Sequence, residues 1–481
     1  MLFNSIDFAF FLPTVFLLYW FVTNRRLKLQ NFLIVAASYL FYGWWDWRFL
    51  SLILISTIVD YTIGLKLKDE NNQPKRKLLL WLSIGVNLGF LGFFKYYNFF
   101  LENFVAAFTL FGAEISANSL NVVLPVGISF YTFQTLSYTI DIYKKKLEPT
   151  KDFIAFSAFV SFFPQLVAGP IERATNLLPQ FYKKRSFDYS KAVDGMRQIL
   201  WGLFKKIVIA DNCAVYANEI FNNSADYSGS TLFLGALFFT FQIYGDFSGY
   251  SDIAIGTSRL FGFDIMRNFN FPYFSRNIAE FWRRWHISLS TWFRDYLYIP
   301  LGGSRGNTLL KIRNTFAIFI VSGFWHGANW TFIVWGILNA IYFLPLMLTN
   351  NNRNYLDTVA SGKFLPNIKE ITQILLTFAL TVFAWIFFRA ENIGHAIQYI
   401  SSMFHNPDSF LILGTYLKYK TIILLLSIFI LIEWLGRDGQ YAISNLGLSW
   451  KRPLRYGMYY ALILAIFWFG GKEQEFIYFQ F

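Results

Sequence analysis

Cysteine, histidine and charged residues are scarce in this chain of 481 residues. The single cysteine, Cys213, excludes an internal disulfide framework and a cysteine-based metal cluster. Charged residues make up 15% of the sequence, well below the roughly 25% of soluble domains, whereas apolar residues reach 55%. This balance excludes an ordinary soluble domain and predicts a protein whose helices face lipid.

Acidic side chains are also few, 29 against 42 basic ones, which gives a formal net charge of +13. The basic residues lie in short loops between apolar runs rather than in one solvated basic domain, so we expect no nucleic-acid partner. Their distribution is typical of the cytoplasmic loops of membrane proteins, with attraction to anionic membrane lipids as a second effect.

Two further absences bear on the organisation of the chain. The first apolar run, 6–22, has no basic segment before it and no small-residue cleavage site, so we expect no cleavable signal peptide. No Pro/Ser-rich linker divides the sequence, and we expect a single integral membrane domain over 1–481. Its motif-rich core would cover 122–348, and its C-terminal helices and aromatic tail would cover 370–481.

Long apolar runs predict an all-α polytopic membrane protein with about 11 to 13 membrane helices. The expected spans are 6–23, 29–46, 48–65, 78–100, 122–143, 192–210, 231–257, 313–325, 328–348, 370–388, 420–435 and 455–469. Segment 152–170 is short and has basic loops on both sides, so a full crossing would place one of these loops on the wrong side of the membrane. We therefore predict that 152–170 is re-entrant.

The lysine and arginine content of each loop predicts the side of the membrane that it faces. Basic loops, which we expect to be cytoplasmic, are 24–28, 66–77, 144–151, 171–191 and 258–312. Loops 101–121 and 211–230 contain neither lysine nor arginine, and we expect them outside. This arrangement predicts a multi-pass protein of the inner (plasma) membrane with an extracytoplasmic N-terminus.

The chain has only four histidines, and two of them lie in segments rich in tryptophan, glycine and arginine. His326 lies where spans 313–325 and 328–348 meet, and Gly323 and Gly327 have the spacing that lets helix backbones approach closely. An ionisable side chain at membrane depth is costly, so His326 is a functional candidate. The alternative is a structural histidine at a tight helix crossing.

The second of these histidines, His286, lies in segment 277–298, which has apolar residues at helical spacing and arginines off that stripe. This pattern predicts one amphipathic helix lying in the cytoplasmic interface, with His286 pointing toward its apolar side. A buried, hydrogen-bonded structural histidine is the alternative here.

The remaining motifs limit the chemistry that the chain can perform. No histidine pair has metal-ligand spacing, so we expect no metal site. No serine elbow or cysteine–histidine pair supports a covalent mechanism, which leaves a buried, neutral histidine as a general base. The polar segment 244–252 could line a tunnel or tie helices together by hydrogen bonds. The glycine-rich turn 301–306 could hold a phosphate through its amides and Arg305, or could be a simple turn.

Four motifs together resemble the membrane-bound O-acyltransferase (MBOAT) family. They are SFFPQLVAGPIER, YGDFSGYSDIAIGTSRLFGF, RRWHISLSTWFRDYLYIPLGGSRG and SGFWHGANWTFIVWG. The resemblance extends over 1–345 and is strongest to the members that O-acetylate alginate in bacteria; those that transfer D-alanine to teichoic acid are more distant. It implies a helical bundle around a central tunnel and acyl transfer from a cytoplasmic thioester. It also implies that His326 is the essential histidine and that His286 is a second catalytic candidate.

The resemblance further implies the substrates. The donor would be acetyl-coenzyme A or another acyl thioester, a substrate rather than a bound cofactor. Four arginines would supply counter-charges for this donor: Arg283, Arg284, Arg294 and Arg305. The acceptor would be an exported or cell-surface polysaccharide, reached through an extracytoplasmic acetyltransferase partner. Two alternative functions are a non-enzymatic polysaccharide exporter or channel and a lipid acyltransferase.

The chain ends in FIYFQF, a mostly aromatic tail. This tail could anchor the chain at the membrane interface, or it could fold back toward the tunnel or dock a partner. In the folded-back position, Tyr478 could contact the acyl group or carry it transiently. Asn329, which lies three residues after His326, is a further candidate for an orienting or relay group.

Overall fold

The computed structural model describes residues 1–110, 112, 119–120, 123–405, 412–471 and 474–477. Every regular element within these ranges is a helix, which confirms the all-α fold class. Four helical segments are long and apolar enough to cross a membrane: Leu27–Asp69, Gln73–Leu110, Trp330–Leu348 and Ile368–Arg389. The chain is therefore a polytopic membrane protein, and the larger number of spans inferred above stays a prediction.

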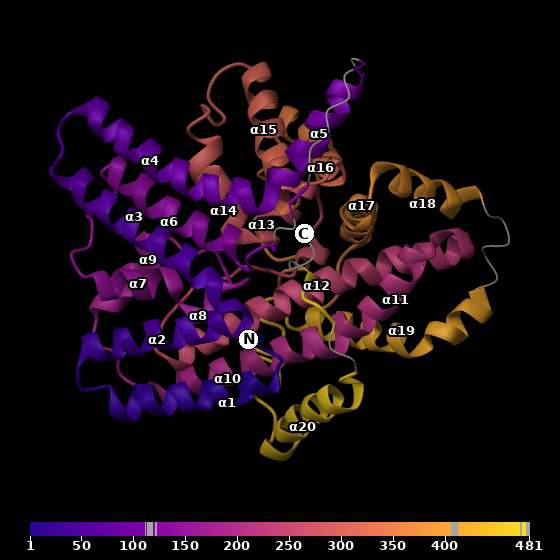
Figure 1. Cartoon of the computed structure of the whole chain (residues 1–481). Helices are drawn as coiled ribbons and strands as arrows, with labels where there is room; N and C mark the ends of the chain where they lie inside the picture. The colour runs from indigo at the N-terminus through magenta and orange to yellow at the C-terminus, as the bar shows by residue number, and fades with distance from the viewer. Residues whose placement is uncertain (111, 113–118, 121–122, 406–411, 472–473, 478–481) are drawn as a thin grey trace. The chain divides into compact units, whose positions relative to one another are not determined.

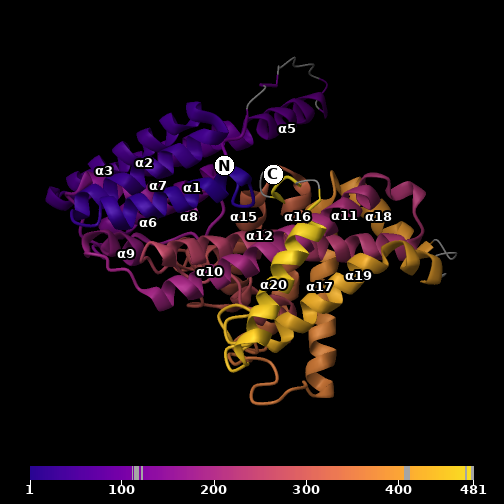
Figure 2. The same cartoon turned by 90° about the horizontal axis from the view of Figure 1, so that it is seen from below.

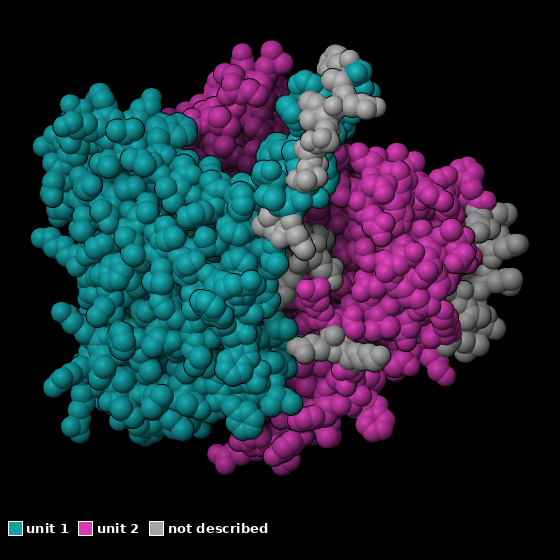
Figure 3. Space-filling model, in the orientation of Figure 1, with its two compact units in different colours: residues 1–192, 257–266 teal, residues 193–256, 267–481 magenta. Residues whose placement is uncertain are grey.

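The described residues cluster into two compact units, which Figure 3 colours separately. Unit 1 comprises residues 1–192 and 257–266, and unit 2 comprises residues 193–256 and 267–481. The chain passes from unit 1 to unit 2 within α10 (Tyr189–Leu203), back to unit 1 within α12 (Gly229–Leu260) and again to unit 2 after residue 266.

Unit 1 is built from consecutive, mostly apolar helices (Figure 1). They are α1 (Ile6–Leu17), α2 (Leu27–Asp46), α3 (Leu50–Asp69), α4 (Gln73–Leu91), α5 (Tyr97–Leu110), α6 (Ile128–Tyr143), α7 (Phe153–Ser161), α8 (Phe163–Leu166) and α9 (Ala174–Leu177). Single turns of π or 3₁₀ helix connect several of them: Leu18–Val22, Trp47–Phe49, Gly92–Tyr96 and Leu178–Tyr182. α6 packs against both α3 and α4.

A buried carboxylate ties α3, α4 and α6 together inside unit 1. Asp60 of α3 accepts hydrogen bonds from Ser83 Oγ at 2.5 Å and Asn87 Nδ2 at 2.8 Å, both on α4. Thr139 of α6 donates a third bond, at 3.1 Å. Because a polar group in an apolar interior is costly unless it is hydrogen-bonded, these three donors fix how the helices pack.

The predicted re-entrant segment 152–170 forms two short helices rather than one span. Asp152 caps α7 by accepting a hydrogen bond from the Ala155 amide, and the helix ends at Ser161, before the backbone turns extended at Phe162. α7 has 9 residues and α8 has 4. At 1.5 Å per residue neither can cross a hydrocarbon layer about 30 Å thick, so this segment does not cross as one helix.

Unit 2 contains the two histidine motifs and the C-terminal helices. Its helices, besides parts of α10 and α12, are α11 (Asp211–Asn222), α13 (Ile278–Arg284), α14 (Ile287–Phe293), α15 (Thr308–His326), α16 (Trp330–Leu348), α17 (Ile368–Arg389), α18 (Ile393–His405), α19 (Ile412–Leu435) and α20 (Arg452–Phe469). Short π or 3₁₀ turns cover Phe204–Ala210, Ser224–Asp226, Pro272–Phe274 and Arg294–Tyr298.

Two predicted loops were wrong in part. Residues 101–110 of the predicted loop 101–121 belong to α5, and α11 occupies most of the predicted loop 211–230. α11 escaped hydropathy reasoning because it carries Asp and Asn side chains, although Cys213, Ala217 and Ile220 form a buried face at helical spacing. The predicted cytoplasmic loop 258–312 contains α13 and α14, within the stretch 277–298 where helix was expected.

α15 and α16 form a tightly packed hairpin, visible in Figures 1 and 2. A Cβ atom placed on Gly323 would lie 2.2 Å from the carbonyl oxygen of Phe332, and one on Gly327 would lie 2.0 Å from the Phe332 ring. Only glycine permits this approach, as the sequence predicted. The hairpin places His326 at the last residue of α15, three residues before Asn329 caps α16.

Replacing Gly323 by alanine should weaken this hairpin, because the added methyl group overlaps a backbone carbonyl that cannot move aside. We expect a loss of about 1–3 kcal/mol, measured as a lower unfolding midpoint of the purified protein in detergent. Gly457→Ala on α20 is the matched control, since a Cβ atom there meets nothing within 4 Å. Equal midpoints for the two variants would contradict the close approach.

Candidate active site in unit 2

His286 lies at a break between two short helices rather than inside one. Asn277 caps α13, which ends at Arg284, and α14 begins at Ile287. The predicted single helix over 277–298 was therefore wrong. The reason is the backbone of His286, whose φ of 42° falls in the left-handed region that residues other than glycine rarely adopt. Such local strain is concentrated at functional sites.

The imidazole of His286 is buried and held on one edge by Asn268. Its Nδ1 lies 3.1 Å from Asn268 Oδ1, and the ring of Phe247 on α12 meets it edge-on at 4.6 Å between centroids. Burial lowers the pKa of His286 to about 3. The side chain is therefore neutral at physiological pH and able to accept a proton.

His326 is also buried, at the C-terminal end of α15, and aromatic rings surround it. Its ring centroid lies 5.3 Å from that of Trp335 on α16 and 5.2 Å from that of Phe388 on α17. Trp335 in turn stacks on Trp385 at 5.6 Å. Two helices, α16 and α17, therefore contribute to an aromatic wall that keeps this imidazole away from bulk water.

Trp325 connects the two histidines. Its ring lies 6.1 Å from that of His286 and 4.8 Å from that of His326, both within the range of aromatic contact. His286 and His326, which are 40 residues apart in the sequence, thus belong to one buried cluster. Both imidazole rings lie in apolar surroundings. Such a cluster suits proton transfer in a site that excludes water.

The polar segment 244–252 of α12 makes buried ion pairs. Lys205 pairs with Asp252 at 2.6 Å, and Lys206 pairs with Asp246 at 2.8 Å. Both lysines lie on the segment between α10 and α11. These contacts agree with the interpretation that the segment ties helices together, while a tunnel beside it stays a prediction.

The described part of the C-terminal tail folds back into unit 2. Lys206 Nζ donates to the carbonyl oxygen of Gln474 at 3.2 Å, and the amide of Ile477 donates to Asp246 Oδ2 at 2.7 Å. Phe476 packs on Tyr250 of α12 at 5.1 Å and is buried, as is Ile477. The tail is thus anchored on α12 through Asp246 and Tyr250. Tyr478 itself lies outside the described residues.

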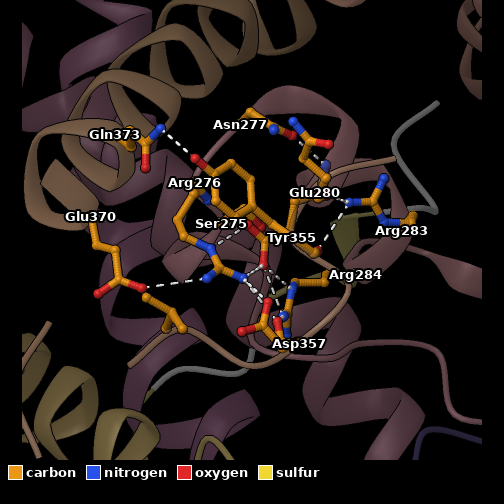
Figure 4. Close-up of polar contacts among 12 residues, drawn as sticks. Ser275, Arg276, Asn277, Glu280, Arg283, Arg284, Tyr355, Asp357, Glu370 and Gln373 are labelled. Atoms are coloured by element: carbon orange, nitrogen blue, oxygen red, sulfur yellow. Dashed lines mark hydrogen bonds and ion pairs between the residues drawn. The ribbon is translucent and has the colours of Figure 1, made fainter. Parts of the chain in front are cut away.

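Two of the predicted donor-binding arginines take part in a polar network that joins α13 to segment 352–357 (Figure 4). Arg284 pairs with Glu280 at 2.9 Å and donates to the carbonyl oxygen of Asp357 at 2.7 Å. Arg283 donates to the carbonyl oxygens of Asn352 and Asn354, both at 2.7 Å. Both guanidinium groups therefore stabilise the contact between α13 and segment 352–357. A donor-binding role for them stays a prediction.

A third arginine, Arg276, lies at the centre of this network. It pairs with Glu280 and Asp357, each at 3.0 Å, and its guanidinium group lies 4.3 Å from the ring of Tyr355 (Figure 4). Glu370 on α17 is 3.4 Å away. The i, i+4 spacing of Arg276, Glu280 and Arg284 is a local pattern, but no sequence pattern connects these residues to Asp357 or Glu370.

The other two predicted donor-binding arginines, Arg294 and Arg305, are exposed. Arg294 pairs with its neighbour Asp295 at 2.7 Å. In the turn 301–306, the amides of Leu301, Gly302, Gly303 and Arg305 already donate to backbone carbonyl oxygens. These contacts agree with a simple turn, and a phosphate-binding role for the turn and Arg305 stays a prediction.

Asn329 is the N-terminal cap of α16. Its Oδ1 accepts a hydrogen bond from the Thr331 amide at 3.0 Å, and its Nδ2 donates to the carbonyl oxygen of Glu391 at 2.7 Å. These contacts give it a structural role in ordering the turn after His326. An orienting or relay role for Asn329 stays a prediction.

Sequence reasoning missed two residues that define the surroundings of His286. Asn268 lies in a stretch without regular secondary structure, and no motif or periodicity singles it out. Phe247 is one of 58 phenylalanines, so its residue type carries no information by itself. A partial signal was available for Phe247, because it lies within the polar segment of α12 that the sequence did single out.

Comparison with known proteins gives the class of this chain. Residues 144–388 match the membrane-bound O-acyltransferase family, MBOAT. The Pseudomonas putida protein "Probable alginate O-acetylase AlgI" is 42% identical over 410 residues, which cover 85% of this chain and 81% of the relative. The Helicobacter pylori "Peptidoglycan O-acetyltransferase" is 38% identical over 435 residues, 84% of this chain and 80% of the relative.

A more distant similarity is to the Bacillus subtilis "Teichoic acid D-alanyltransferase", 28% identical over 57% of this chain and 71% of the relative. The chain belongs to the membrane-bound O-acyltransferase family, as the motifs indicated. It is a multi-pass membrane enzyme that transfers an acyl group to an oxygen atom. These comparisons give no support to a non-enzymatic exporter.

Proposed function

We propose that this enzyme moves an acyl group, most simply acetyl, from a cytoplasmic thioester to a polysaccharide of the cell envelope. The observation that carries this proposal is the buried cluster of His286, Trp325 and His326, which combines two proton acceptors with a water-excluding aromatic wall. The names of the relatives refer to alginate, peptidoglycan and teichoic acid, which supports a polymer as the acceptor rather than a lipid.

In the reaction that we propose, a hydroxyl oxygen attacks the carbonyl carbon of the thioester. A carbon–oxygen bond forms and the carbon–sulfur bond breaks. His326 takes the hydroxyl proton as general base and returns it to the departing thiolate, so no net charge develops in the buried site. The surrounding rings of Trp335 and Phe388 exclude water that would otherwise hydrolyse the thioester.

The proposed topology places donor and acceptor on opposite sides of the plasma membrane. The donor, acetyl-coenzyme A or a related thioester, is anionic and would approach the basic cytoplasmic loops, with Arg294 and Arg305 as exposed counter-charges. An extracytoplasmic acetyltransferase partner would receive the acyl group outside and pass it to the polysaccharide. The N-terminus would then be extracytoplasmic.

The role of His326 can be tested by replacing it with alanine. Loss of the general base should lower acyl transfer from a labelled thioester by about 10²- to 10⁴-fold while the protein stays folded. His405→Ala is the control, because His405 is exposed at the end of α18 and should leave transfer unchanged. Near-normal transfer by folded His326→Ala protein would rule out the assignment.

The donor side can be tested with Arg294→Ala and Arg305→Ala. Each should weaken binding of acetyl-coenzyme A by about 2- to 5-fold at low ionic strength, with a smaller effect at high salt, because exposed charges are screened. Isothermal titration in nanodiscs measures the affinity, and the exposed Arg452→Ala on α20 is the control. Unchanged affinity in both variants would place the donor mouth elsewhere.

The possible relay through Tyr478 can be tested with Tyr478→Phe, which keeps the aromatic ring and removes the hydroxyl group. If the phenolic oxygen carries the acyl group, this variant should lose acyl transfer. Mass spectra of the variant should also show no acyl label on the tail. Full activity in Tyr478→Phe, with loss only on deletion of residues 476–481, would leave a docking role and exclude the relay.

A further inference from the structure

The imidazole of His286 shares its hydrogen-bond partner with two other groups. Asn268 Oδ1 lies 3.1 Å from His286 Nδ1, accepts from the Ser288 amide at 3.2 Å and accepts from Ser288 Oγ at 2.9 Å. Asn268 Nδ2 points the other way and donates to Ser251 Oγ at 3.2 Å. Asn268 is fully buried, so these contacts are not exchanged for contacts with water.

The backbone amide of Ser288 fixes the orientation of the Asn268 side chain. An amide can only donate, so the atom that faces it must be the carbonyl oxygen of the asparagine and not its nitrogen. The same oxygen faces His286 Nδ1. Ser288 Oγ also lies 3.4 Å from Nδ1, but its proton is donated to Asn268 Oδ1 at the shorter distance of 2.9 Å. Since a carbonyl oxygen can only accept, Nδ1 carries the proton in the contact with Asn268. In a neutral imidazole the other nitrogen, Nε2, then carries the lone pair.

The main chain holds this geometry independently of the side chains. The amide of Ile287 donates to the carbonyl oxygen of Asn268 at 2.9 Å, and the amide of Asn270 donates to that of Arg284 at 2.9 Å. Segment 268–270 is therefore pinned to both sides of the break between α13 and α14. The left-handed backbone of His286 turns its ring onto this segment. The strained conformation therefore allows the hydrogen bond between His286 and Asn268.

We infer that Asn268 is a positioning residue that holds His286 in the Nδ1–H tautomer, so that Nε2 is the proton-accepting atom offered to the acyl-transfer site. The tautomer follows from the hydrogen bonds alone, whereas its catalytic use rests on the proposed function. Asn268 touches neither donor nor acceptor in this arrangement and acts through the imidazole.

The charged and titratable groups on the elements packed around His286 also enter the test. They include Tyr244, Asp246, Tyr250 and Asp252 on α12, Arg267 before Asn268, Glu280, Arg283 and Arg284 on α13, and His326 on α15. Asp246 and Asp252 face Lys206 and Lys205, and Arg284 faces Glu280. Because the charges of Asp246, Asp252 and Arg284 are paired, a carboxylate introduced at position 268 would be the new charge nearest to Nδ1.

The tautomer can be read directly by nitrogen-15 solid-state NMR of histidine-labelled protein in lipid. With only four histidines in the chain, the signal of His286 is assigned by its loss in His286→Gln. A protonated Nδ1 and an unprotonated Nε2 are expected in the wild type. A protonated Nε2 would overturn the inference whatever the enzyme's activity.

Variants of Asn268 test whether this residue sets the tautomer of His286 and the rate of acyl transfer. Asn268→Asp keeps the acceptor and should preserve the tautomer while moving the protonation of His286 to higher pH, because a carboxylate stabilises imidazolium. Asn268→Leu removes the acceptor and should give mixed tautomers and at least about tenfold slower transfer. Asn339→Leu is the matched control: this buried asparagine on α16 donates to the carbonyl oxygen of Trp335, and its replacement should leave the His286 signals unchanged.

The two hypotheses fail in different ways. If wild-type protein transfers no acyl group, or if His326→Ala transfers it normally, the proposed function is refuted. The tautomer measured by NMR is not affected by that outcome. If wild-type protein is active and Asn268→Asp titrates His286 as the wild type does, or folded Asn268→Leu keeps wild-type tautomer and rate, the role of Asn268 is refuted.

Discussion

Keeping two imidazoles inside an apolar helical interior is the requirement on which the local structure of unit 2 depends. A buried polar ring needs defined partners, because no water is present to replace them. At His286 this requirement accounts for the break between α13 and α14, the left-handed backbone and the buried Asn268. At His326 it accounts for the position at a helix end, where a glycine-lined hairpin leaves room for the ring between Trp335 and Phe388.

The same requirement organises the charged residues around the site. Lys205 and Lys206 neutralise the two carboxylates of α12, and the second of these pairs also holds the backbone of the C-terminal tail. Arg276 and Arg284 share Glu280 and bind segment 352–357 to α13. Breaking one partner of such a buried pair leaves an uncompensated charge, so these contacts favour one arrangement of helices around the histidines.

The sequence predicted the helical fold and the close approach at Gly323 and Gly327, because each leaves a local pattern in composition or spacing. It also singled out both histidines, whose catalytic roles stay predictions. It did not predict that His286 breaks a helix, since the apolar spacing of 277–298 continues through the break. Nor could it find Asn268, Phe247 or Arg276, whose roles arise from contacts between segments far apart in the chain. Local patterns indicate which face of a helix is buried, whereas tertiary packing determines which side chains contact one another.

The central claim is that His286 and His326 act as one site connected through Trp325. Steady-state transfer rates of His286→Gln, His326→Gln and the double variant, measured in one lipid and at one pH, test it most directly. Groups that act as a unit show strongly non-additive losses, so the double variant should be no slower than the slower single variant. Losses that multiply in the double variant would contradict the claim and place the two histidines in separate roles.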